Sequence, residues 1–334
     1  MLQLVFGRSG YGKTEYIRNR IAEKIDRGET QVLLITPEQY SFISEYSLLE
    51  QLGEARAHAV RCLSFSRLCD ECDRLYGADG RKPLTKGGKA ILMKTAIDQV
   101  RPDLELFEKK GGSAAFVQSM TGIYDEMKSC NLSGAAGYAA ADDLDTDILR
   151  CKMRDFSRIM TAYEALLGDR FADPANRLTR LYDQIKDQNY FAGQTVFLDG
   201  FNGFVAQEYK ILERIIAEAK AVYIALDSDS FGTGDGYDLF AYVNETAGIL
   251  QRIADKAGVP TTALQLSENC RTDYADLRRV EQYIFADQAP ETEISAEHIR
   301  LYAASTVTDA CNDLALQIKG LLRCGYRAGE IAVT

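Results

Sequence analysis

The sequence has no tryptophan, only two histidines, and no long apolar run. His58 and His298 are isolated in the sequence and suggest no catalytic triad. No apolar stretch reaches the roughly 18 residues of a membrane-spanning helix, and no basic-then-apolar leader precedes the first apolar segment. We therefore expect a cytoplasmic chain with no secretion signal and no membrane partner.

Cysteine chemistry is also sparse. The eight cysteines are scattered through apolar segments, and without a leader they are best interpreted as reduced thiols. Cys69 and Cys72 form a lone C-x-x-C pair, with no second pair at the spacing of a zinc ribbon. We favour two buried thiols over metal or redox chemistry.

Net charge sets a further limit. With 39 basic and 49 acidic residues the formal charge is −10, which argues against broad, nonspecific attraction to nucleic acid. It leaves a local basic groove open, because clustering matters more than the sum. The length of 334 residues allows two or three domains with cores of their own.

The strongest motif lies near the start of the chain. Residues 7–14 match G-x-x-x-x-G-K-[ST], the P-loop signature, between an apolar segment at 2–6 and a helix with an isoleucine every fourth residue. Backbone N–H groups of such a loop bind phosphate oxygens, aided by the helix dipole. The predicted nucleotide-binding residues are Gly7, Arg8, Ser9, Gly10, Tyr11, Gly12, Lys13 and Thr14. Lys13 would reach the β- and γ-phosphates, and Thr14 would bind Mg²⁺.

Further buried strands are expected at 31–35, 59–63, 195–199 and 221–226, alternating with helices. This alternation predicts an α/β fold, a P-loop NTPase with a parallel sheet. Helical spacing over 77–189 predicts a large all-helical insertion, with 134–147 as a loop or a short capped helix. Strands at 299–302 and 329–333 would begin a second α/β domain. The expected domains are therefore 1–76 with 190–296, then 77–189, then a truncated 297–334, the front portion of a longer protein.

In this order the motifs resemble a family. The P-loop, Thr36-Pro37-Glu38-Gln39, residues 63–68 (Leu-Ser-Phe-Ser-Arg-Leu), a helical insertion and an aspartate-ending strand are similar to the motor core of superfamily 1 helicases. With residues 198–201 (Leu-Asp-Gly-Phe), the chain more narrowly resembles the AddB-type subunit of bacterial helicase–nuclease complexes. The resemblance covers most of the chain. It implies ATP and Mg²⁺ as cofactors.

The sequence departs from active helicases after the aspartate strand. Motors of this class carry Asp-Glu-x-Gln-Asp, whose glutamate orients the attacking water, whereas residues 199–203 read Asp-Gly-Phe-Asn-Gly. Asp199 can still hold Mg²⁺ together with Thr14. Gly200 lacks the carboxylate of a general base, a group that contributes roughly 10²–10⁴ to a rate. We therefore expect ATP binding with weak or absent hydrolysis, and assign no catalytic residue.

The resemblance also implies contacts outside the P-loop. Residues 266–272 resemble the helicase L-x-x-N-x-R-[ST] element, which would place Arg271 near the γ-phosphate; the alternative is a surface arginine. Gln39, Phe65 and Arg67 fall in elements that touch the DNA strand, with Phe65 stacking on a base and Arg67 contacting a phosphate. A core phenylalanine and a solvated arginine are the alternative.

AddB-type subunits act in double-strand break repair and recombination, so the resemblance implies an AddA-type motor partner and single- or double-stranded DNA ends as partners. A nuclease domain, with most ligands of an iron–sulfur cluster, would lie beyond Thr334. Two rival functions stay open. One is a small-molecule P-loop kinase with a helical lid, and the other is an interaction scaffold in which ATP is structural.

Overall fold

The structure is a computed structural model that describes residues 1–334 except 79, 110–111, 134–145, 231–238, 287–290 and 292–294. It divides into two compact units, Met1–Cys270 and Arg271–Thr334. None of the described helices is both long and apolar enough to cross a membrane. The segment 134–147, expected as a loop or short helix, lies almost wholly outside the described residues.

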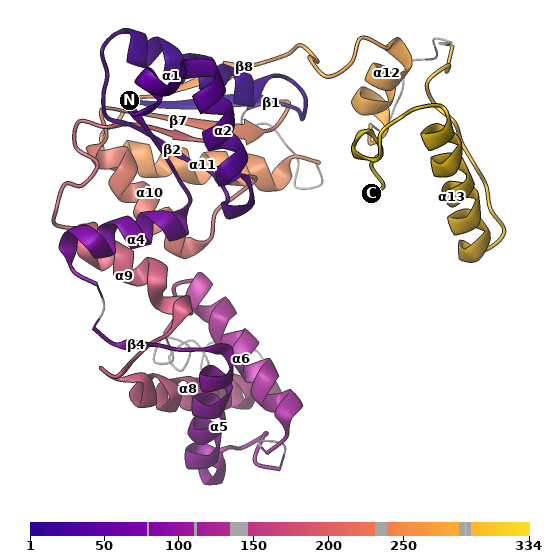
Figure 1. The fold of residues 1–334 in the computed structure, drawn as a ribbon. Helices are drawn as coiled ribbons and strands as arrows, with labels where there is room; N and C mark the ends of the chain where they lie inside the picture. Colours follow the sequence, from indigo (N-terminus) through magenta and orange to yellow (C-terminus); the bar gives the residue numbers. More distant parts are fainter. Residues whose placement is uncertain (79, 110–111, 134–145, 231–238, 287–290, 292–294) are drawn as a thin grey trace. The chain divides into compact units, whose positions relative to one another are not determined.

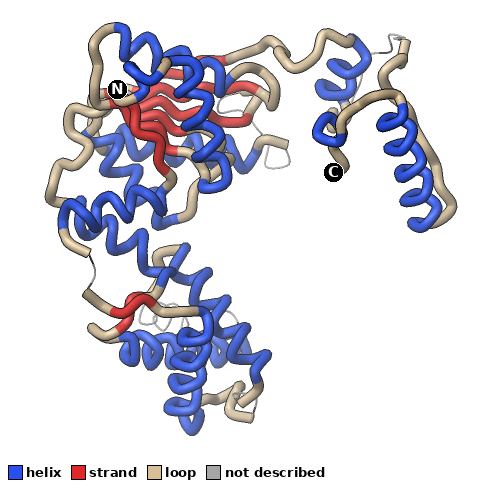
Figure 2. The backbone as a smooth tube through the Cα atoms, viewed as in Figure 1, coloured by secondary structure: helices blue, strands red, loops and turns tan. Residues whose placement is uncertain are grey.

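A six-stranded, fully parallel sheet forms the centre of the first unit, as the strand–helix alternation predicts (Figures 1 and 2). Its order is β3-β2-β6-β7-β1-β8. The strands are β1 (Leu2–Gly7), β2 (Val32–Ile35), β3 (Val60–Leu63), β6 (Thr195–Leu198), β7 (Ala221–Asp227) and β8 (Thr261–Gln265). The inner strands read as continuous apolar runs because helices cover both of their faces.

Side chains alternate between the two faces of each strand. Leu33 and Ile35 belong to one core cluster, with helices α4, α9, α10 and α11, whereas Val32 and Leu34 belong to another, with α1 and α2. The helices around the sheet are α1 (Lys13–Asp26), η1 (Glu38–Tyr40), α2 (Ser41–Leu52), α3 (Glu54–Ala57), α4 (Phe65–Tyr76), α9 (Arg177–Ile185), α10 (Ala206–Glu218) and α11 (Ala241–Lys256). Neighbouring strands can therefore be followed by helices on opposite faces.

A helical region with its own core separates α4 from α9 in the sequence. Apolar side chains of its three long helices form that core, including Met93, Met120 and Tyr163. Its elements are β4 (Lys82–Pro83), α5 (Lys86–Val100), η2 (Arg101–Asp103), α6 (Ala114–Ser129), α8 (Asp147–Leu167), β5 (Phe171–Ala172) and η3 (Pro174–Asn176). The helical spacing in the sequence identifies these helices because one face of each is apolar. The region is not all-helical as expected, because β4 and β5 pair as a short parallel two-stranded sheet.

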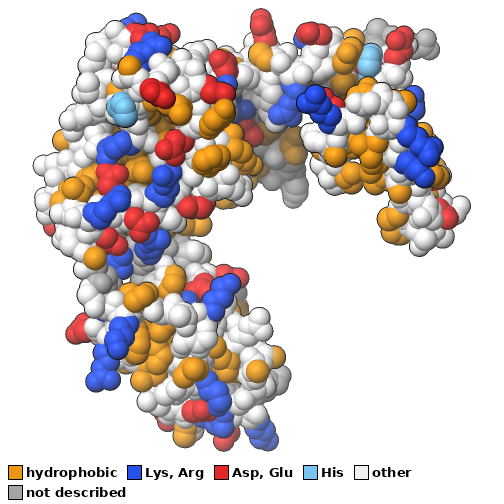
Figure 3. All heavy atoms as spheres, viewed as in Figure 1, with side chains coloured by type: hydrophobic (Ala, Val, Ile, Leu, Met, Phe, Trp, Pro, Cys, Tyr) orange, Lys and Arg blue, Asp and Glu red, His pale blue; other side chains and the backbone are white. Residues whose placement is uncertain are grey.

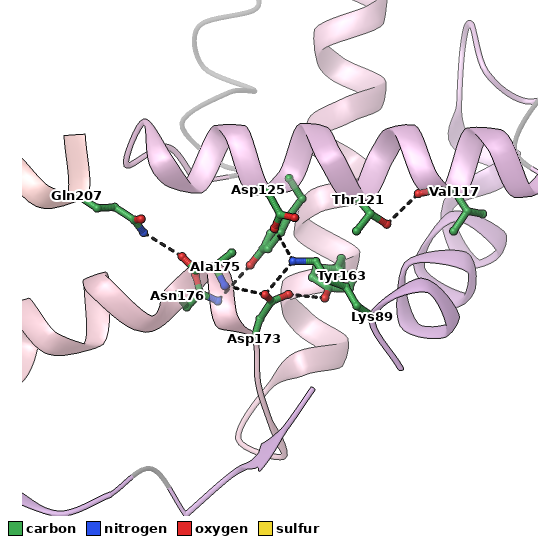
Figure 4. A network of polar contacts seen from close by, with 10 residues as sticks. Lys89, Val117, Thr121, Asp125, Tyr163, Asp173, Ala175, Asn176 and Gln207 are labelled. Atoms are coloured by element: carbon green, nitrogen blue, oxygen red, sulfur yellow. Dashed lines mark hydrogen bonds and ion pairs between the residues drawn. The ribbon is translucent and has the colours of Figure 1, made fainter. Parts of the chain in front are cut away.

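A buried polar network ties this region together (Figure 4). The carboxylate of Asp173 accepts hydrogen bonds from Lys89 Nζ at 2.8 Å and from the Tyr163 hydroxyl at 2.6 Å, and Lys89 also pairs with Asp125. The side-chain amide of Gln207, on α10, donates to the Ala175 carbonyl at 3.0 Å. This last bond connects the helical region to a helix that packs on the sheet.

The second unit contains α12 (Ala275–Tyr283), α13 (Val307–Arg323) and η4 (Ala328–Glu330). The segments expected as strands, 299–302 and 329–333, differ from that expectation, because neither pairs with another strand among the described residues. Leu301 is 98% exposed. An apolar run forms a strand only where a neighbouring strand completes its hydrogen bonds, and these segments have none in the described part of the unit.

Candidate nucleotide site

The order of the strands places a switch point at the carboxyl edge of the sheet. β1 and β7 are neighbours, with Gly7 beside Asp227 in register. The helices that follow them, α1 and α11, pack on opposite faces. In open parallel sheets such a switch point leaves a crevice outside the strand ends, where ligands bind. The glycine-rich loop 7–14 emerges there.

The loop adopts two left-handed glycine conformations, at Gly10 with φ 86° and at Gly12 with φ 78°. Gly12 is also the residue that precedes α1, and no described side chain caps the first turn of that helix. The N–H groups of the first turn are therefore available to an anion, which the positive end of the helix dipole favours.

Close packing leaves little room in the loop for larger side chains. A Cβ at Gly7 would lie 3.2 Å from Tyr11 Cβ and 3.3 Å from the Leu266 carbonyl oxygen. The N–H of Cys270 donates to the Gly10 carbonyl at 2.8 Å, so the segment after β8 lies against the loop. These contacts hold the loop in a defined conformation.

Lys13 is 9% exposed, unusually low for a lysine. Its ammonium donates to the carbonyls of Gly7 at 2.8 Å and Arg8 at 2.9 Å. It also forms an ion pair with Asp227, with Nζ 2.5 Å from Oδ1. A positive charge is thus fixed at the mouth of the loop, where a phosphate would bind.

Asp199 follows β6 and is 8% exposed. Burial raises the pKa of its carboxyl group, and the Thr14 hydroxyl, the Gly200 N–H and the Lys13 ammonium oppose that rise. The charge of Asp227 adds to the rise. The structure therefore brings together Lys13, Thr14 and Asp199, three residues that the sequence predicts for one site.

A divalent cation fits these groups. A hydroxyl and carboxylates are the oxygen donors that Mg²⁺ prefers. A buried carboxylate with a raised pKa is also a group whose charge a cation would stabilise. Among the described residues there is no cluster of three or more histidine, cysteine, aspartate or glutamate side chains able to hold a metal by themselves. Any cation here would consequently depend on a ligand such as a phosphate for further oxygens.

Gly200 has a left-handed backbone with φ 82°. A Cβ at this position would lie 3.4 Å from Pro37 Cδ and 3.6 Å from Tyr40 Cδ2. A side chain would therefore start toward the 37–40 turn. Position 200 therefore differs from that of a glutamate general base in two ways: it lacks the carboxylate, and its backbone has a conformation that disfavours any side chain.

Asp227 and Asp229 are site residues that the motifs in the sequence did not reveal. Asp227 pairs with Lys13, and Asp229 Oδ2 lies 2.8 Å from Arg8 Nη2. The guanidinium of Arg8 also lies over the Phe240 ring, 5.5 Å from its centroid. One feature of the sequence could have pointed to Asp227. β7 is a second buried strand with an aspartate at its carboxyl end, and β6 is likewise followed by an aspartate, Asp199.

The three expected DNA contacts occupy different environments. Gln39 is exposed in η1, and the side chain of Arg67 is 43% exposed and pairs with Glu45 at 3.2 Å. Phe65 is 6% exposed and packs edge-on against Phe201, with centroids 5.8 Å apart. The Phe65 ring is thus a core contact first, and base stacking would require it to leave Phe201.

Both basic and acidic residues line a cavity next to Phe65. Its volume is about 500 Å³, and Phe65, Lys86 and Arg177 are among the residues that line it. Elsewhere on the face of the first unit seen in Figure 3, basic and acidic side chains are interspersed. The described residues of this face thus show no broad basic patch, as the net charge of −10 leads us to expect.

Arg271 begins the second unit, Arg271–Thr334. Its expected approach to the γ-phosphate therefore stays a prediction.

Cys69 and Cys72 are 1% and 0% exposed on α4. Burial raises the pKa of the Cys69 thiol to about 11 and that of Cys72 to about 12. Both thiols are protonated at neutral pH and pack in the core, which supports the interpretation as buried thiols.

Comparison with known proteins places this chain in a family. A family model described as "ADDB, N-terminal" matches residues 4–281. Proteins named as one subunit of an "ATP-dependent helicase/deoxyribonuclease" are similar over nearly the whole chain. That of Clostridioides difficile is 28% identical over 333 residues, 96% of this chain and 29% of its own length. Those of Clostridium botulinum and Clostridium novyi are 27% and 26% identical, over 99% of this chain and 30% of their own lengths.

The chain thus spans about 30% of the length of these relatives. The match includes β1 from Leu4 onward, the glycine-rich loop, Asp199 and the segment after β8. It covers well over half of the chain, and the resemblance found in the sequence is confirmed. The chain belongs to the AddB N-terminal family.

Proposed function

We propose that this chain is the nucleotide-binding, helicase-like N-terminal part of a helicase–nuclease subunit that acts in DNA double-strand break repair and recombination. It binds ATP with Mg²⁺, hydrolyses it weakly or not at all, and grips single-stranded DNA together with a motor partner. The relatives' names support this proposal, because they combine ATP dependence, helicase and deoxyribonuclease with the word subunit. We also propose the domain ranges expected from the sequence, 1–76 with 190–296, then 77–189, then 297–334; the second compact unit of the structure begins earlier, at Arg271.

The observation that carries the proposal is the position of Lys13. Its ammonium lies at the N-terminus of a helix without a side-chain cap among the described residues, and at a switch point of a parallel sheet. Backbone N–H groups, the helix dipole and a fixed cation all favour bound phosphate there. A glycine turn that served only to connect β1 to α1 would have no need for a buried lysine.

Thr14 and Asp199 are the residues that would hold Mg²⁺ on the nucleotide. The cation would supply electrostatic stabilisation of the phosphates. Gly200 accounts for the weak hydrolysis, because it provides no carboxylate to orient water and its backbone directs a Cβ toward Pro37. Binding and turnover are therefore separated in this site.

For DNA, the proposal relies on Gln39, Arg67 and the cavity lined by Lys86 and Arg177. Arginine and lysine contacts to phosphates supply affinity without sequence preference. The interspersed charges elsewhere imply that this grip is local and weakens as salt rises.

Titration calorimetry with a non-hydrolysable ATP analogue and Mg²⁺ tests the proposal. Wild type should bind saturably. Lys13→Ala should lose at least about 100-fold in affinity, because the Lys13 ammonium contacts the phosphates directly. Lys94→Ala, which removes the exposed partner of Asp98 on α5, is the control and should bind as wild type does. No binding by wild type would overturn nucleotide recognition and favour a scaffold. Phosphate transfer to a metabolite would instead favour a kinase.

A further inference from the structure

Two ion pairs link the glycine-rich loop to the residues at the carboxyl end of β7. Lys13 Nζ lies 2.5 Å from Asp227 Oδ1, and Arg8 Nη2 lies 2.8 Å from Asp229 Oδ2. Both cations belong to the loop, and both anions belong to one short segment. The loop and β7 are thus connected by charge as well as by the strand register.

Lys13 has no spare donor in this arrangement. An ammonium carries three N–H donors, and three acceptors lie within 3 Å: the Gly7 and Arg8 carbonyls and the Asp227 carboxylate. A phosphate oxygen can contact Lys13 only if one acceptor withdraws. The two carbonyls are fixed in the loop backbone, whereas the Asp227 side chain is 41% exposed and can turn into water.

Asp227 also repels the anion that replaces it. The Asp227 carboxylate and a phosphate are both negative, so they repel each other when they lie close together. The strength of this repulsion depends on the local dielectric, but its sign does not. Of the three acceptors around Lys13, the Asp227 carboxylate is therefore both the most free to move and the one that an incoming phosphate repels most.

We propose that Asp227 competes with the nucleotide phosphates for Lys13, and Asp229 competes for Arg8. Nucleotide binding then releases the carboxyl end of β7 from the loop. The inference rests on the proposed nucleotide function and extends it. It makes Asp227 a determinant of nucleotide affinity and makes β7 the strand whose end responds to nucleotide.

The released segment is not independent of its surroundings. Ser228, between the two aspartates, is fully buried, and its Oγ lies 2.9 Å from Oδ1 of Asn244 on α11. A movement of Asp227 and Asp229 would therefore also move Ser228, which is hydrogen-bonded to α11. Nucleotide binding would be reported to α11 through this contact.

Calorimetry on Asp227→Asn tests the competition. In EDTA, this variant should bind ATP and inorganic tripolyphosphate more tightly than wild type, on the order of 10-fold, because a competing and repelling charge is gone. The gain should shrink with Mg²⁺, which neutralises part of the phosphate charge. Asp26→Asn, which removes the partner of Arg56 on the surface of α1, serves as the control and should change nothing.

Unchanged or weaker binding by Asp227→Asn, beside a wild type that binds, would overturn this inference alone. Binding that is unchanged in EDTA and weaker with Mg²⁺ would make Asp227 a metal ligand and also overturn it. No binding by wild type would overturn the proposed function and the inference together. Asp229→Asn provides a second variant if Asp227→Asn does not fold.

Hydrogen exchange supplies an independent readout. Without nucleotide, the amides of residues 8–14 should exchange faster in Asp227→Asn than in wild type. With nucleotide, the amides of residues 227–230 should exchange faster in wild type than in its nucleotide-free form. Slower or unchanged exchange at 227–230 would contradict release of β7.

Discussion

Pro37 lies close to where a side chain at Gly200 would begin, at the ends of neighbouring strands: its Cδ is 3.4 Å from the point where a Cβ at position 200 would be. β2 and β6 pair directly, so the turn after one strand meets the turn after the other. Gly200 combines this contact with a φ of 82°. The position therefore favours glycine for reasons of backbone geometry, apart from any role in hydrolysis.

Gly200→Glu should fail to restore efficient ATP hydrolysis. A left-handed residue with a Cβ costs about 1–2 kcal/mol, so we expect Gly200→Ala to lower the free energy of unfolding by about that amount in urea denaturation. Gly122→Ala is the matched control, since Gly122 lies inside α6 with nothing within 4 Å of its Cβ position. It should gain roughly 0.5–1 kcal/mol. A Gly200→Glu variant with rapid turnover would contradict the geometric argument.

Asp199→Asn should stabilise the metal-free chain at neutral pH while it weakens Mg²⁺-dependent nucleotide binding. Burial raises the pKa of Asp199 in the folded state, so the folded chain binds this proton more tightly than the unfolded chain. Ionised Asp199 therefore lowers the free energy of unfolding at neutral pH. This loss disappears as the pH falls through the raised pKa of Asp199 toward the ordinary value of 3.8.

Thermal unfolding of wild type and Asp199→Asn in EDTA checks this from pH 7 downward. The melting temperature of the variant should be higher at pH 7, and the difference should narrow as the pH is lowered. A variant that is less stable than wild type at neutral pH would show that the bonds from Thr14 and Gly200 outweigh the burial cost.

Asp173→Ala should destabilise the helical region strongly. The Asp173 carboxylate is fully buried and pairs with Lys89, whose side chain is only 10% exposed. Removing it leaves the Lys89 ammonium with the half-exposed Asp125 carboxylate as its remaining charged partner and takes away the acceptor of the Tyr163 hydroxyl. Breaking such a buried pair costs up to about 3–5 kcal/mol. Tyr163→Phe, which removes one donor to the same carboxylate, should cost about 1–2 kcal/mol.

Urea denaturation measures both losses against Asp183→Ala, which removes an exposed partner of Lys186 and should stay within about 0.5 kcal/mol of wild type. A loss for Asp173→Ala no larger than that of Asp183→Ala would mean that the network in Figure 4 contributes little to stability.

Arg67→Ala should weaken binding of single-stranded DNA by the full-length subunit with its partner. One lost phosphate contact lowers the slope of log affinity against log salt by about 1, nearly uniformly across sequences. Fluorescence anisotropy over a salt series measures this slope. Arg56→Ala, an exposed arginine paired with Asp26, is the control. An unchanged slope in Arg67→Ala would leave Arg67 with a structural role alone, as a partner of Glu45 and of the Cys62 carbonyl.

Local patterns in the sequence were sufficient for the sheet, the long helices and the loop. Short apolar runs predict buried strands, as for β1, and apolar residues at 3.6-residue spacing predict helices with one buried face, as for α1. The grouping of Lys13, Thr14 and Asp199 also followed, because strand ends of a parallel sheet meet at one edge.

Strand order was not available from those patterns. Asp227 became a site residue only because β7 lies between β6 and β1, a neighbour relation that no local pattern encodes. Phe65 illustrates a choice that the motif left open, between base stacking and a core position, and Phe201, far away in the sequence, packs against its ring. Residues 299–302 have the apolar character of a strand but lack a paired neighbour among the described residues.

The most direct test of the account is a steady-state ATPase assay at saturating Mg²⁺–ATP, on protein whose binding has been measured by calorimetry in the same preparation. We expect saturable binding, lost in Lys13→Ala, with turnover at least roughly 100-fold below that of an active motor of this class, as the absence of a general base predicts. Rapid turnover that is lost in Lys13→Ala would show that another carboxylate takes the place of the one missing at Gly200. It would contradict the central claim.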